Sequence, residues 1–63
     1  MKQLNLDEII LSENRLSTEY AMDATTLKHV GDTEGSVKMS NMSNYHKTIA
    51  DSLVKLQQYE NSG

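Results

Sequence analysis

Apolar residues recur at helical spacing in two separate stretches of this 63-residue chain, which contains no cysteine. A chain of this length without disulfides rarely buries a core worth more than ~3–5 kcal/mol. We therefore predict an all-α fold, a two-helix antiparallel hairpin that homodimerisation completes as a four-helix arrangement. The residues expected in its core or interface are Leu6, Ile9, Ile10, Leu16, Tyr20, Leu27, Met39, Met42, Tyr45, His46, Ile49, Leu53 and Leu56.

The apolar composition supports the expectation of a partner. Hydrophobic residues make up 37% of the chain, and its aromatic residues are three tyrosines, with no tryptophan or phenylalanine. Large rings bury roughly 150–250 Å² each, so a core made mainly of Leu, Ile and Met is thin for a monomer. We expect a second protein surface to complete it.

The first helix is predicted over residues 5–30. Asn5 is a suitable N-cap, and Asp7 and Glu8 place negative charge at the positive end of the helix dipole. Gly31 suits the left-handed position after a helix, and Lys28 lies in the last turn, where positive charge is favoured. Both ends of this helix are therefore marked in the sequence.

Two features interrupt the apolar face of the first helix. Glu13 falls within the apolar face, so its carboxylate must reach the rim, find a cationic or hydroxyl partner, or lie at a junction between chains. Asp23, followed by Thr25 and Thr26, weakens the helix interior, so the sequence also allows a kink or an earlier end near residue 23.

A polar loop over 31–36 is expected to connect the helices of a single domain, 1–63. The following serines and asparagines compete for backbone hydrogen bonds, which leaves three possible starts for the second helix, at Ser36, Ser40 or Ser43. We thus predict a second helix from residue 37 or 43 to 60, with fraying over 61–63.

The apolar stripe of the second predicted helix begins with methionines, and its spacing resembles a short coiled-coil seam. Met39 and Met42 are flexible side chains that fill gaps in cores and also occur on adaptable binding surfaces. His46 lies at the edge of the stripe, a common place for a rim or interface histidine. The end of the stripe formed by these three residues is where we expect an adaptable contact.

The charge distribution argues against binding to nucleic acid. Six Lys and Arg oppose nine Asp and Glu, which gives a net charge of −3, and the basic residues are spread almost evenly along the chain. Nucleic-acid affinity depends largely on clustered cations that neutralise phosphates. We therefore expect protein partners.

Targeting and membrane signals are absent from the sequence pattern. The start of the chain is polar and acidic, without the apolar segment of a signal peptide, and the longest apolar run is Ile9-Ile10-Leu11. Spanning a bilayer requires about 20 apolar residues. We expect a soluble cytoplasmic protein with no membrane contact.

No arrangement of residues indicates catalysis. His29, Asp32 and Glu34 offer the best metal-like spacing, but Gly31 interrupts the helix that would align them. No Ser-His arrangement or phosphate-binding glycine loop occurs, and two helices are not expected to form a ligand pocket of roughly 300 Å³. We predict no catalytic residues, no metal, no cofactor and no enzymatic activity.

The sequence favours a small protein–protein interaction module that binds and regulates or inhibits a larger protein, as phage antagonists of host machinery do. One alternative is a small dimeric DNA-binding regulator, which requires Lys28, Lys38, Lys47 and Lys55 to gather on one surface across the dimer. A structural subunit of a larger assembly is another alternative.

Overall fold

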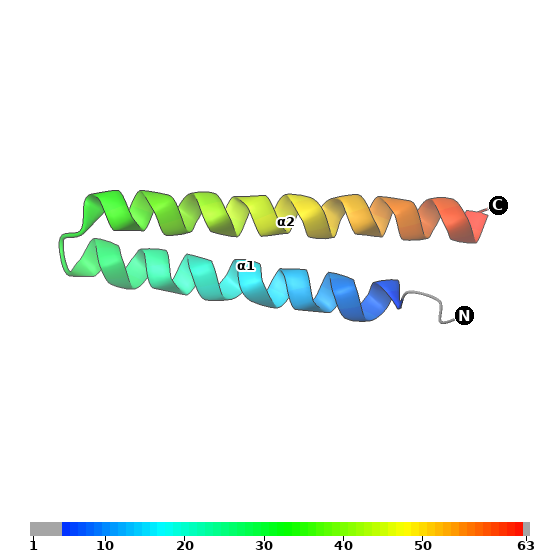
Figure 1. Ribbon diagram of the computed structural model, residues 1–63, viewed down its shortest axis with the longest axis horizontal. Coiled ribbons are helices and arrows are strands. Elements are labelled where there is room, and N and C mark those ends of the chain that lie inside the picture. The colour runs from blue at the N-terminus through cyan, green and yellow to red at the C-terminus, as the bar shows by residue number, and fades with distance from the viewer. Residues whose placement is uncertain (1–4, 63) are drawn as a thin grey trace.

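The chain forms an antiparallel helical hairpin in a computed structural model that describes residues 5–62. Helix α1 spans Leu6–His29 and helix α2 spans Thr33–Ser62. Figure 1 shows the two helices side by side along the length of α1, with the start of α1 and the end of α2 at the same end of the hairpin, where α2 extends beyond α1. The predicted all-α, two-helix architecture is confirmed.

Local signals at both ends of α1 act as predicted. The Asn5 side chain accepts a hydrogen bond from the Glu8 amide at 3.3 Å, which satisfies one of the free donors of the first turn. At the other end, Gly31 adopts a φ of 88°, and the amide of the next residue, Asp32, donates to the Leu27 carbonyl at 2.9 Å. This is the left-handed helix end that a glycine favours.

Helix α1 continues through residue 23 without a break, so neither the kink nor the early end occurs. The hydroxyls of Thr25 and Thr26 donate to the carbonyls of Ala21 and Met22, each at 3.1 Å. These bonds to the preceding turn satisfy both hydroxyls within the helix.

Helix α2 begins earlier than any of the three predicted starts. Asp32 caps it: the side chain accepts from the Gly35 amide at 2.9 Å, and its carbonyl accepts from the Ser36 amide at 3.0 Å. The connection is therefore residues 30–32. The predicted loop over 31–36 is too long because the Asp32 cap starts the helix at Thr33.

The serine-rich segment that follows is helical because its side chains bond across to α1. Ser36 donates to the Ala24 carbonyl at 2.8 Å, which replaces a competing bond to its own backbone. The helix ends at Ser62, two residues beyond the predicted end at residue 60. Residues 61 and 62, which were predicted to fray, are therefore helical, and Gly63 lies outside the described part of the chain.

The hairpin is a single layer of helices. It measures 49 × 19 × 13 Å, and its shortest dimension is close to the diameter of one helix with its side chains, about 10–12 Å. Among residues 5–60, whose side chains are described, only Ala50 is buried, with 1% of its surface exposed. Apolar elements normally bury their faces between two layers, and the described hairpin forms one layer whose apolar side chains stay partly exposed.

Candidate interaction surface

The contact between the helices, which we call the seam, follows a heptad-like repeat. On both helices the more buried positions alternate in steps of mostly three and four residues, as in a coiled coil. On α1 these positions are Leu6, Ile9, Glu13, Leu16, Tyr20, Ala24 and Leu27, and on α2 they are Ser36, Met39, Ser43, His46, Ala50, Leu53 and Gln57. Small and polar residues thus take several seam positions on α2.

Two serines form a reciprocal polar contact between the helices. The Ser17 hydroxyl lies 2.9 Å from the Ser43 carbonyl, and the Ser43 hydroxyl lies 2.8 Å from the Ser17 carbonyl. Each hydroxyl can therefore donate to the opposite backbone, which requires the two backbones to approach closely. Small side chains permit this approach, and the buried Ala50 continues it two turns further along α2.

One turn from the serines, Glu13 of α1 pairs with His46 of α2. The His46 Nδ1 atom lies 2.9 Å from one carboxylate oxygen of Glu13 and 3.2 Å from the other. The side chains are 16% and 15% exposed, so this pair lies largely inside the seam. Because an ionised carboxylate only accepts hydrogen bonds, the pairing places a proton on Nδ1.

Two tyrosine rings enclose this histidine. Tyr20 stacks on His46 with ring centroids 5.4 Å apart and 12° between the planes. Tyr45 meets the same imidazole edge-on, at 5.5 Å and 77°. Of the alternatives predicted for Glu13, the structure shows a partner on the other helix, His46. The stacking of Tyr20 on His46 fixes the orientation of the imidazole.

The residues predicted for the core or interface divide into two groups. Those half-buried in or beside the seam are Leu6, Ile9, Ile10, Leu16, Tyr20, Leu27, Met39, His46, Ile49 and Leu53. The remaining three, Met42, Tyr45 and Leu56, are 38%, 61% and 46% exposed. The sequence pattern did not separate these groups, nor did it identify Ser17, Ser43 and Ala50 as residues of the contact between the helices.

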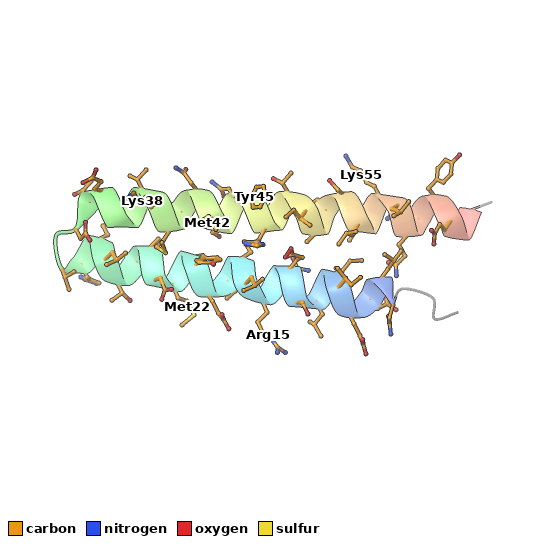
Figure 2. All side chains as sticks on the ribbon, viewed as in Figure 1. Arg15, Met22, Lys38, Met42, Tyr45 and Lys55 are labelled. Carbon is orange, nitrogen blue, oxygen red and sulfur yellow. The ribbon has the colours of Figure 1, made fainter. Side chains whose placement is uncertain are left out.

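The exposed group, together with the half-buried Ile49, forms one apolar strip along α2. Met42, Tyr45, Ile49 and Leu56 follow one another at three, four and seven residues, so they lie on one side of the helix. Figure 2 shows Met42 and Tyr45 at the middle of α2. We call these four residues the α2 strip; its exposure is what a face without its packing partner looks like.

Two of the basic side chains lie on opposite sides of the hairpin. Arg15 points away from α2 on the outer side of α1, together with Met22, whereas Lys55 points away from α1 on the outer side of α2 (Figure 2). A single hairpin therefore presents these cations in opposite directions. The gathering of lysines that DNA binding requires would have to be created between chains.

Hollows on the surface are shallow and open. One of about 350 Å³ is lined by Ala21, Ala24, Thr25, Lys28, Ser36 and Ser40, and one of about 390 Å³ involves Thr25, Lys28 and His29. Their volumes exceed what we expected of two helices, because the small residues of the seam leave grooves beside it. Both are open to solvent and do not enclose a ligand.

Within the described residues, no three His, Asp or Glu side chains converge in a way that could hold a metal ion, and His29, Asp32 and Glu34 form no such group. Neither α1 nor α2 contains, in the part that the structure covers, an apolar stretch able to span a bilayer.

No protein-family model, curated protein or solved structure matches this chain.

Proposed function

We propose that this chain is a protein–protein interaction module of the cytoplasm, which assembles with a second copy of itself and binds and regulates a larger protein. The observation that carries the proposal is that, among residues 5–60, Ala50 alone is buried. A fold whose helices form one layer gains little hydrophobic stabilisation alone, and another protein surface supplies the missing layer.

The total surface supports the need for a partner. The accessible area is 5218 Å², whereas a compact monomer of 7.1 kDa exposes about 4,100 Å². The excess of about 1,100 Å² is comparable to the ~800 Å² that each partner buries in a standard protein interface. One interface of ordinary size would bring the chain to the burial expected of a folded protein.

The apolar surface left on α1 is available for the larger partner. Leu11 and Met22 are exposed and lie three helical turns apart on nearly one line of α1. Met22 points away from α2 (Figure 2), so a contact made by α2 leaves it accessible. We propose that the regulated protein binds along this line.

Co-purification from the native cells tests the regulatory part of the proposal. The wild-type chain should retain a larger protein that the Leu11→Glu/Met22→Glu variant loses, while a Lys47→Glu variant, which makes the same change in net charge at an exposed position of α2, retains it. Equal retention by the wild type and the double variant would contradict the assignment of this surface.

Two single substitutions test the requirement for an apolar partner on α2. Ile49→Asp should unfold the hairpin or dissociate its oligomer, because it places an unpaired charge in the middle of the α2 strip. Lys47→Asp, at an exposed position, should leave circular dichroism and sedimentation nearly unchanged. Equal tolerance of both substitutions would show that the α2 strip is not covered.

A further inference from the structure

We propose that a second copy of this chain covers the α2 strip by packing α2 against α2 of the partner subunit in antiparallel orientation, with the twofold axis at Ile49. The inference rests on the proposed function, in that it assumes a protein partner for the strip. It adds the face of the chain that the second copy covers, the orientation of its helix and the register.

Met42 and Leu56 of the strip, and the charged residues beyond them, are arranged symmetrically about Ile49. Met42 and Leu56 lie seven residues before and after it, and Lys38 and Glu60 lie eleven residues before and after it. Seven and eleven residues are close to two and three whole turns of a helix, so all five positions share one side of α2.

This symmetry makes the strip complementary to itself in one orientation. In an antiparallel pair centred on Ile49, Met42 meets Leu56 of the partner subunit, and Lys38 meets Glu60 of the partner subunit. The apolar residues then cover one another, and each end of the contact carries a pair of opposite charges. An interface of this kind, in which both copies use the same patch, is the usual form of a twofold dimer.

The parallel orientation lacks this complementarity. It would place Lys38 beside the same lysine of the other copy and Glu60 beside the same glutamate, so like charges would meet at both ends. Within one chain the two residues are separated by twenty-two positions of one helix, about 33 Å, and cannot pair. Both are exposed in the hairpin.

The burial required is within what the chain can supply. The strip and its charged ends extend over about 33 Å of helix, and the chain exposes about 1,100 Å² more than a compact monomer of its mass. A stable dimer needs about 800 Å² from each copy. Stacking two hairpins through this surface also produces the two layers of helices that a packed core requires.

Cysteine cross-linking reads the register directly, because the natural chain contains no cysteine. Ile49→Cys should form a covalent dimer on mild oxidation, since a disulfide joins Cα atoms about 4.4–6.8 Å apart. Met42→Cys alone and Leu56→Cys alone should stay largely unlinked, whereas an equimolar mixture of the two should give the mixed dimer. Lys47→Cys, on another side of α2, is the matched control and should not link.

Charge reversal tests the ends of the contact. Lys38→Glu or Glu60→Lys should each weaken the dimer by roughly tenfold at low salt, and the double variant should restore it. Either single change places a charge favoured by the helix dipole at that end of α2, so weakening does not follow from loss of helix. Rescue in the double variant requires contact between two chains.

The possible results separate this inference from the proposed function. Self-linking of Met42→Cys and of Leu56→Cys would overturn the antiparallel register and show a parallel dimer. A dimer in which none of these cysteines links would place the second copy elsewhere and overturn the inference, while leaving the interaction module intact. A chain that sediments as a folded monomer, yet loses a larger partner on Met42→Glu/Leu56→Glu substitution, would assign the strip to that partner. This result would overturn the inference and the self-assembly in the proposed function, while leaving the binding of a larger protein intact.

Discussion

The Glu13–His46 pair allows a quantitative test of how the seam is stabilised. His46→Leu removes the only described partner of a carboxylate that is 16% exposed, whereas Glu13→Leu removes the acceptor of the imidazole. The double variant removes both polar groups and leaves an apolar contact at a seam position. Leaving one member of a largely buried pair alone costs more than replacing both.

The magnitudes follow from burial and chemistry. His46→Leu should cost about 2 kcal/mol, because it leaves a carboxylate in the seam and removes the stacking on Tyr20. Glu13→Leu should cost about 1 kcal/mol, because a neutral imidazole remains enclosed by its tyrosines. The double variant should lie within about 1 kcal/mol of wild type, which gives a coupling energy of at least about 2 kcal/mol.

Thermal and urea unfolding of the four proteins at one fixed chain concentration provides the assay, since oligomerisation makes stability depend on concentration. His46→Leu should lower the Tm by about 10 °C, and the double variant should recover most of this loss. Additive costs, with the double variant the least stable of the four, would refute the view that the two side chains act as a pair.

Three further substitutions probe the close contact and the helix ends. Ala50→Leu should destabilise the protein by about 1–3 kcal/mol in urea unfolding, because a larger side chain forces the helices apart at a position that is 1% exposed, whereas Lys47→Ala should change little. Gly31→Ala should cost about 1–2 kcal/mol, because φ is 88° there; an unchanged midpoint would mean that the turn relaxes. Asn5→Ala should cost about 1 kcal/mol and increase amide exchange in the first turn of α1, and unchanged exchange would remove Asn5 as the cap.

Local features of α1 could be predicted because their causes lie within a few residues of each other. Asn5 and Gly31 determine the ends of the helix through their own backbone and side-chain preferences. The predicted start of α2 is too late. The sequence does contain a cap signal there, because an Asp side chain can accept from the amide three residues later, as Asp32 does from Gly35. The serines and asparagines beyond it outweighed that signal in the prediction.

The facing of α2 could not be predicted from hydrophobic periodicity alone. Periodicity identifies the most apolar side of a helix, whereas the seam is determined by how closely two backbones approach, and Ser43 and Ala50 give little apolar signal. The Glu13–His46 contact joins residues 33 positions apart on different helices, so the sequence around either residue does not indicate the other as its partner. Once the antiparallel register is known, the two positions fall opposite one another.

The central claim, that a second copy supplies the missing layer, is tested most directly by sedimentation equilibrium of the full chain over micromolar concentrations. We expect a folded species of twice the 7.1 kDa chain mass that dissociates when Met42 and Leu56 are both replaced by glutamate. A wild-type species of single chain mass that remains helical and unfolds cooperatively at these concentrations would contradict the claim.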